Sequence, residues 1–444
     1  MLMRMVLTLS ALLMATPALA VDLLQIYQDA QANDARYAAA KAAYQARQER
    51  LPQAKAGLRP SVNLDARYNY NDLDVDYDSA AFNSGRRNYS AYDYGVNLTQ
   101  PLYRRQNMLA VSQAEIEVAQ AATELDLAAQ DLILRTAQAY FDVLLARFNL
   151  RTERSQQSAL AEQLEQAKRN FVVGTATITD QREAQARYDL TSARVLVAEN
   201  DLRVVKQALE VLTGKPVTDE LAGLRPNTAF EAPTPTSIDA WVERAYANNL
   251  EILRARQTVE IAQTEIKIQR AGHQPTLDLV GSLNQAHQGS SAFGVGSDTT
   301  AGVIGVEFNL PIYQGGAISS RTREAIAAEQ RSADELENTR RSVGQSTREA
   351  YLGVTSGIAQ VSAYTQAVSS TQLQLESTKL GQEVGVRTQV DVLNAEGQLA
   401  LANLDLARVV YNTLLSQLRL QASVGRLVEA DLLSINDLLD TQAR

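Results

Sequence analysis

The sequence of 444 residues contains no cysteine and only two histidines, His273 and His287. Disulfide bonds and thiol chemistry are thereby excluded, and too few ligands remain for a thiolate or histidine-rich metal site. Basic residues are also outnumbered, with 42 Lys and Arg against 51 Asp and Glu and a net charge of -9. An acidic chain lacks the basic stripe that neutralises phosphates, so we expect no nucleic-acid partner.

Catalytic motifs are missing as well. Gly214-Lys215 does not belong to a phosphate-binding loop, because Leu209 stands where the first glycine of that motif is needed. No nucleophile and base pair stands out, so we expect no enzyme, no bound cofactor and no metal. Calcium is a weak alternative for the acidic stretch at 72–78, which lacks the glycine spacing of an EF-hand. Its position between two predicted strands favours a solvated external loop.

Long hydrophobic runs are confined to the first 20 residues. Arg4, an apolar run over 6–15 and the small-residue site at Ala18-Leu19-Ala20 predict a secretory signal peptide, 1–20. Since no cysteine follows Ala20, lipid anchoring at that site is excluded. No later run approaches the ~18 to 20 apolar residues of a spanning helix. The exported chain therefore either stays soluble or crosses a membrane as strands.

Four short segments alternate apolar and polar side chains with a period of two, which predicts β-strands at 61–70, 92–99, 277–283 and 304–310. Each run is close to the ~10 residues that cross a bilayer obliquely, and tyrosines near the ends suit an interfacial girdle. A soluble sandwich sheet would alternate in the same way and stays open as an alternative. Four strands cannot close a barrel without edges in lipid, so chains would have to share one, and three copies would give twelve strands.

Glycine and proline are absent between Arg104 and Val173, where good helix formers predict one helix of about 100 Å. A heptad seam for close helix packing runs along it through Val118, Ala122, Leu125, Ala129, Leu132, Thr136, Ala139 and Val143. A second long helical region follows Pro311.

The chain also repeats itself. Ala139-Tyr140 returns as Ala350-Tyr351, Gly174 as Gly385 and Asp180 as Asp391, each at an offset of 211. We therefore predict an α+β protein with two structural repeats, 21–213 and 237–424. A proline-rich linker, 214–236, joins them, and a C-terminal segment, 425–444, follows. Within each repeat, a Val-Gly turn forms the tip of a helical hairpin, and Thr177 and Thr388 are candidate caps of the returning helices.

Several phrases, taken together, resemble the TolC family of outer-membrane channel proteins over the whole chain after the signal peptide: "HQPTLDL", "LPIYQGG", "TAQAYFDVL", "ITDQREAQARYD" and "VGVRTQVDVLNA". The resemblance implies a homotrimer in the outer membrane of a Gram-negative bacterium. Its 12-strand β-barrel would meet outer-membrane lipid, and a 12-helix α-barrel of coiled-coil helices would continue through the periplasm.

The resemblance also implies a function. The trimer would be a passive exit duct for multidrug efflux or type I protein secretion. Its partners would be a periplasmic adaptor (membrane fusion) protein and an inner-membrane transporter of RND or ABC type. A soluble periplasmic coiled-coil scaffold is the alternative, although it leaves the paired apolar stripes of the strands unexplained.

The resemblance assigns roles to the hairpin tips. Asp391 would line the pore constriction, together with Asn394, which stands where such gates often carry a second Asp. Arg387 would hold the gate closed against Thr179 and Asp180. Adaptor docking falls to the exposed turns, Val173, Gly174, Thr175, Val384, Gly385 and Val386. The plain alternative is that Arg387 and Asp391 form an intrahelical ion pair.

Overall fold

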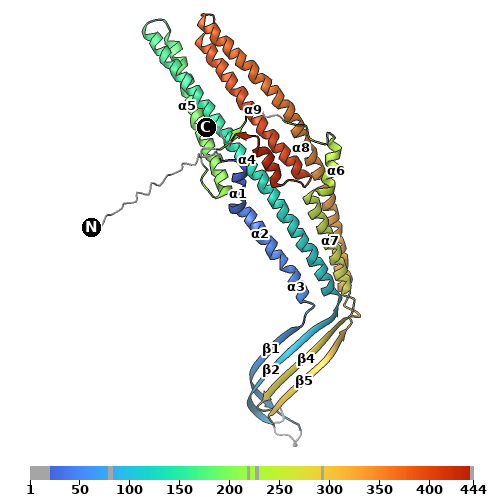
Figure 1. Cartoon of the computed structure of the whole chain (residues 1–444). Coiled ribbons are helices and arrows are strands. Elements are labelled where there is room, and N and C mark those ends of the chain that lie inside the picture. The colour runs from blue at the N-terminus through green and yellow to red at the C-terminus, as the bar shows by residue number, and fades with distance from the viewer. Residues whose placement is uncertain (1–20, 79–83, 218–220, 226–229, 292–294, 441–444) are drawn as a thin grey trace, which may run out of the picture. The chain divides into compact units, whose positions relative to one another are not determined.

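A computed structural model of the chain describes residues 21–78, 84–217, 221–225, 230–291 and 295–440 (Figure 1). The predicted signal peptide lies outside these residues. The chain forms two compact units. Unit one holds the segments up to Ala38, Ala128–Asn249 and the chain from Gly344, and unit two holds Ala39–Leu127 and Leu250–Val343.

Unit two contains an antiparallel four-stranded sheet in the order β1-β2-β4-β5 (Figure 1). Its strands are β1 (Ser61–Val75), β2 (Gly85–Arg104), β4 (Thr276–Gln288) and β5 (Ser297–Asn309), so all four predicted strands are confirmed. They are longer than predicted, and β1 includes Asp72 and Asp74. The predicted external loop was therefore wrong at its start, because Arg86 on β2 pairs with Asp72 and continues the ladder.

The register of the sheet places apolar side chains beside one another. Leu64 on β1 lies opposite Val96 on β2, which lies opposite Leu283 on β4. Since successive side chains alternate between faces, these residues share one face of the sheet. Leu64 is 73% exposed, and Val96 and Leu283 are exposed as well. A contiguous exposed apolar face of this kind is typical of an interaction surface that is covered in the functional protein.

Helices accompany the sheet in unit two. They are α3 (Arg50–Ala56), α7 (Leu250–Ala271), most of α2 (Ala35–Gln48) and the first parts of the two longest helices. Polar side chains join α7 to the first part of α4 (Arg105–Val172), since Gln113 Nε2 lies 3.1 Å from Glu265 Oε2 and Gln120 Nε2 lies 2.7 Å from Thr258 Oγ1.

Four long helices form two hairpins: α4 (Arg105–Val172) with α5 (Ile178–Thr213), and α8 (Ala317–Glu383) with α9 (Gln389–Ser423). The 68 residues of α4 extend for about 100 Å, as predicted. In the predicted seam of α4, Leu132, Thr136 and Val143 are buried and the other positions are partly buried. No helix in the described part of the chain is both long and apolar enough to span a membrane.

The two hairpins lie side by side in unit one, in the order α5, α4, α9, α8 (Figure 1). Arg154 on α4 pairs with Glu199 on α5 at 2.7 Å, and Lys379 on α8 pairs with Glu396 on α9 at 2.9 Å. Between the hairpins, the ring of Phe141 on α4 stacks on Tyr411 of α9, with ring centres 5.1 Å apart. The outermost helices of this layer are therefore α5 and α8.

The main core of unit one gathers distant segments around the middle of α4. It includes α1 (Leu23–Asn33), α10 (Glu429–Asn436) and the short sheet of β3 (Gly223–Leu224) and β6 (Leu439–Asp440). The buried Tyr140 donates its hydroxyl hydrogen to the carbonyl of Ala222 at 2.7 Å, and burial raises the pKa of Tyr140. The remaining helix of this unit is α6 (Ile238–Asn248).

Candidate functional site: the two hairpin tips

Both hairpins turn at a glycine in the left-handed backbone region. The φ angle is +79° at Gly174 and +78° at Gly385, which side chains other than glycine rarely adopt. The turns are otherwise alike, because the amide of Thr175 donates to the carbonyl of Asn170 at 2.9 Å, and that of Val386 to Gly381 at 2.9 Å. Such bonds satisfy the last carbonyls of a helix, so both predicted turns are confirmed.

Each returning helix begins with the same reciprocal cap. Asp391 Oδ2 accepts from the Thr388 backbone amide at 2.8 Å and from its hydroxyl at 2.9 Å, while the Asp391 amide donates to the Thr388 hydroxyl at 3.2 Å. Thr177 and Asp180 repeat the arrangement at 2.8, 2.8 and 3.2 Å. These are capping boxes, and they confirm both predicted threonine caps.

The caps lower the pKa of both carboxylates. The backbone amide of Thr388 is the main cause of a lowered pKa at Asp391, followed by the Thr388 hydroxyl, with the charge of Arg387 contributing least. Thr177 lowers the pKa of Asp180 in the same way. A lowered pKa means that the cap stabilises the tip above the ordinary carboxyl range near pH 4, and that this stabilisation is lost as the pH falls through the lowered value.

Asn394 lies one turn after Asp391 on α9 and is exposed. Residues three apart lie on one face of a helix, so Asp391 and Asn394 share a face. The first hairpin has Asp180 and Glu183 at the corresponding positions, and Glu183 is paired with Arg187 at 2.7 Å. One hairpin thus presents a single acid and an amide where the other presents two acids.

Arg387 lies outside α9, which begins at Gln389 with Thr388 as its cap. The alternative of an intrahelical ion pair with Asp391 was therefore wrong. Arg387 instead lies against Gly381, since a Cβ atom at Gly381 would come within 2.8 Å of Arg387 Cγ. Sequence reasoning missed Gly381, although the first hairpin has Asn170 at the corresponding position.

No hydrogen bond or ion pair joins Arg387 to Thr179 or Asp180 in the described part of this single chain. Thr179 and Asp180 are exposed in the first tip, and Arg387 is exposed in the second. The gate-closing contact stays a prediction that depends on how copies of the chain assemble.

The tips are apolar and exposed. Val386 is 75% exposed, and three more valines project around the two turns, Val172, Val173 and Val384. The Thr175 hydroxyl donates a hydrogen bond to the carbonyl of Asn170 at 3.1 Å. Clustered valines at the ends of two polar hairpins are unfavourable in water and suit a surface that a partner covers.

The chain is similar to known proteins over most of its length. The family described as "Outer membrane efflux protein" matches residues 26–215 and 241–426. Outer membrane protein TolC of Vibrio cholerae is 34% identical over 423 residues, covering 94% of this chain and 93% of that protein. Alkaline protease secretion protein AprF of Pseudomonas aeruginosa is 30% identical over 434 residues, covering 95% and 88%.

A solved structure shows the same fold. The CmeC outer membrane channel of Campylobacter jejuni has a TM-score of 0.79 over 94% of this chain and 90% of that one, at 17% sequence identity. The family match covers most of the sequence, and the similarity to TolC extends over nearly its full length. This chain therefore belongs to the outer membrane efflux protein family.

Proposed function

We propose that three copies of this chain form a duct through the outer membrane, through which efflux or type I secretion substrates leave the cell. The observation that carries this proposal is that a single chain leaves two edge strands of its sheet unpaired. It also leaves the two outermost of its four long helices with an exposed packing seam. Relatives named for the outer membrane and for protease secretion support the location and the transport role. The soluble scaffold is not favoured, because it leaves the exposed apolar face of the sheet without a covering.

The sheet has two edges, β1 and β5, each with one neighbour in the described sheet. An edge strand presents unpaired backbone groups, which cannot stay open to lipid. Pairing β5 of one copy with β1 of the next closes the sheet, and four strands in each of three copies give twelve. The apolar face would then meet outer-membrane lipid.

The outermost helices also carry open seams. Exposed residues recur at heptad spacing along α5, at Leu190, Ala193, Val197, Asn200, Val204, Gln207 and Val211. They recur along α8 at Leu352, Ser356, Ala359, Ala363, Gln366, Ser370, Leu373, Ser377 and Leu380. Alternating steps of three and four are the spacing by which helices pack along their length. We infer that α8 of one copy packs on α5 of the next.

The internal repeat specifies the register of that contact. Phe141 on α4 packs on Tyr411 of α9 within one chain. Advancing Phe141 by 211 residues gives Leu352 on α8, and moving Tyr411 back by 211 gives Asn200 on α5. Leu352 is 56% exposed, whereas Phe141 is 1% exposed. The repeat units, 21–213 and 237–424, would thus pack in alternation around a closed ring of twelve helices.

The tips would meet the partners of the duct. The exposed valines and the two left-handed glycines form the adaptor-docking surface, and an adaptor protein would join the duct to its inner-membrane transporter. In the ring, Asp391 and Asn394 would line the constriction, and Arg387 would hold it closed against Thr179 and Asp180. Repulsion between the carboxylates of three copies would raise the pKa of Asp391, opposing the effect of its cap.

A replacement at the turn tests this function in cells that lack their own channel of this kind. The unaltered chain, together with its adaptor and transporter, should restore export. Gly385→Val should insert but fail to restore it, because a left-handed valine costs about 1 to 3 kcal/mol and reshapes the docking turn. Glu383→Val is the control, since it adds the same side chain at a helical, exposed neighbour. Export failure with the unaltered chain would contradict the duct, and normal export with Gly385→Val would contradict docking at this turn.

A further inference from the structure

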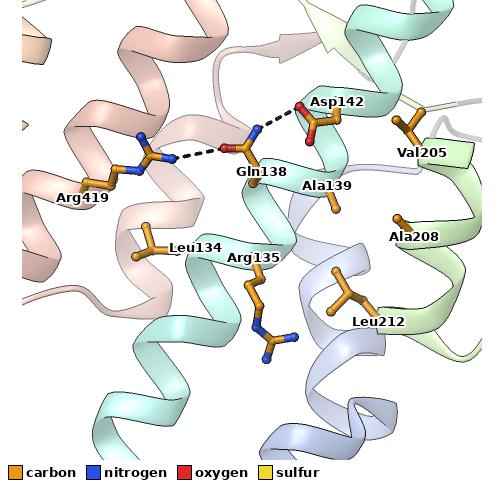
Figure 2. A pocket seen from close by; sticks show the side chains of 9 residues that line it. All are labelled: Leu134, Arg135, Gln138, Ala139, Asp142, Val205, Ala208, Leu212 and Arg419. Carbon is orange, nitrogen blue, oxygen red and sulfur yellow. Dashed lines mark hydrogen bonds between the residues drawn. The ribbon is translucent and has the colours of Figure 1, made fainter. Parts of the chain in front are cut away.

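A cavity of about 350 Å³ lies in unit one among α4, α5 and α9 (Figure 2). Its wall is mainly apolar, with Leu134 and Ala139 from α4 and Val205, Ala208 and Leu212 from α5. The volume is within the range of pockets that hold small organic molecules. The cavity is distant in sequence from both hairpin tips and has no part in the gate.

Asp142 on α4 also lines this cavity, and its carboxylate points toward Gln138 (Figure 2). Asp142 is half-buried, and Gln138 Nε2 donates to its Oδ1 at 2.8 Å (Figure 2). Gln138 Oε1 in turn accepts from Arg419 Nη2 at 3.3 Å, which fixes the orientation of the amide. Within the part of the chain that the structure describes, no basic side chain forms an ion pair with Asp142 within 4.0 Å. Burial raises the pKa of Asp142, and the hydrogen bond from Gln138 only partly opposes that effect.

The two arginines of the lining leave Asp142 without a counter-ion. Arg135 is held by other carboxylates, at 3.0 and 3.1 Å from the oxygens of Asp34 and 2.6 Å from Asp131. Arg419 is exposed on α9, on the opposite side of α4 from the α5 wall (Figure 2). Water screens an exposed charge more strongly than a half-buried one. The unmatched negative charge of Asp142 therefore belongs to the same cavity lining as the apolar side chains of α5.

We propose that this cavity binds a small amphipathic monocation, with its ammonium group on the Asp142 carboxylate and its apolar part against α5. A charge-assisted hydrogen bond to the carboxylate would offset the desolvation that Asp142 already undergoes. The second repeat has no such site, because the position corresponding to Asp142 is Gly353. A Cβ atom there would lie 3.0 Å from Ser416 Oγ, so the helices are in close contact.

Three naphthyl compounds of matched size test the charge preference on the purified protein. Fluorescence anisotropy should show naphthylethylamine binding on the order of tenfold more tightly than naphthylethanol, because only the amine brings a positive charge to the carboxylate, and more tightly than naphthylacetate. Asp142→Asn should remove the difference between the amine and the alcohol. Val205→Trp should fill the cavity and weaken all three. Glu349→Gln, which removes an exposed carboxylate on α8, should leave the preference unchanged.

Equal binding of amine and alcohol by the unaltered protein would overturn this assignment, as would a charge preference that survives in Asp142→Asn. Tighter binding of naphthylacetate would assign the cavity to anions through Arg419 and overturn it as well. Circular dichroism identifies any variant that fails to fold. Binding is measured on the purified protein without export. The outcome therefore does not depend on whether the chain forms an export duct.

Discussion

Leu352→Asp should convert the assembled protein into single chains. In the proposed ring, Leu352 of one copy packs against α5 of the next, and the substitution would place a carboxylate in that packed contact. Burying an unpaired charge costs several kcal/mol, and the variant would repeat that cost at all three contacts of a ring. Native mass spectrometry in detergent should therefore find a trimer for the unaltered chain and single chains for the variant.

Thr365→Asp is the matched control, because Thr365 is an exposed residue of α8 that lies outside the seam. This variant should remain assembled. A Leu352→Asp protein that keeps the mass of the unaltered assembly would contradict the packing of α8 on α5.

Asp391→Asn should weaken the cation preference of the closed channel and its block by trivalent cations. Three carboxylates at a constriction attract multivalent cations, and removing their charge removes that attraction. The asparagine substitution is preferable to alanine because the Asp391 carboxylate also caps α9, and an amide oxygen can still accept from Thr388. Single-channel recording in planar bilayers measures both effects, with the trivalent cation added on the periplasmic side.

Asp189→Asn provides a control, because Asp189 is an exposed carboxylate of α5 that lies outside both tips and the gate contact. It should leave selectivity and block unchanged. Asn394→Asp should strengthen the block by adding a second acidic ring, and Arg387→Ser should raise conductance by loosening the gate. If Asp391→Asn and the unaltered channel show the same selectivity and block, Asp391 does not line the constriction.

The elements that could be predicted from the sequence are those specified by local patterns. Alternation located the four strands, the absence of glycine and proline located α4, and Val-Gly followed by Thr located both turns and caps. These patterns depend only on residues that are close together in the sequence, so they can be recognised before any tertiary contact is known. The position of Arg387 could also have been predicted. If Thr388 caps the returning helix, the residue before it lies outside that helix.

Features made by distant contacts could not be predicted in this way. The start of the external loop depends on Arg86 reaching Asp72 across the sheet. The fit of Arg387 over Gly381 depends on the geometry of the turn, and the cavity at Asp142 needs three helices that are separated by long stretches of sequence. The core that joins α1, α10 and the short β3-β6 sheet likewise leaves no periodic signal.

Cross-linking between copies tests most directly the claim that this chain closes into a ring through α8 and α5. Because the protein has no cysteine, Asn200→Cys together with Leu352→Cys introduces the only two thiols. A short bis-maleimide added to intact cells should give a ladder of dimers and trimers on denaturing gels, and neither single variant should give trimers. The double variant running as single chains after treatment, despite complete labelling of both thiols, would contradict the ring.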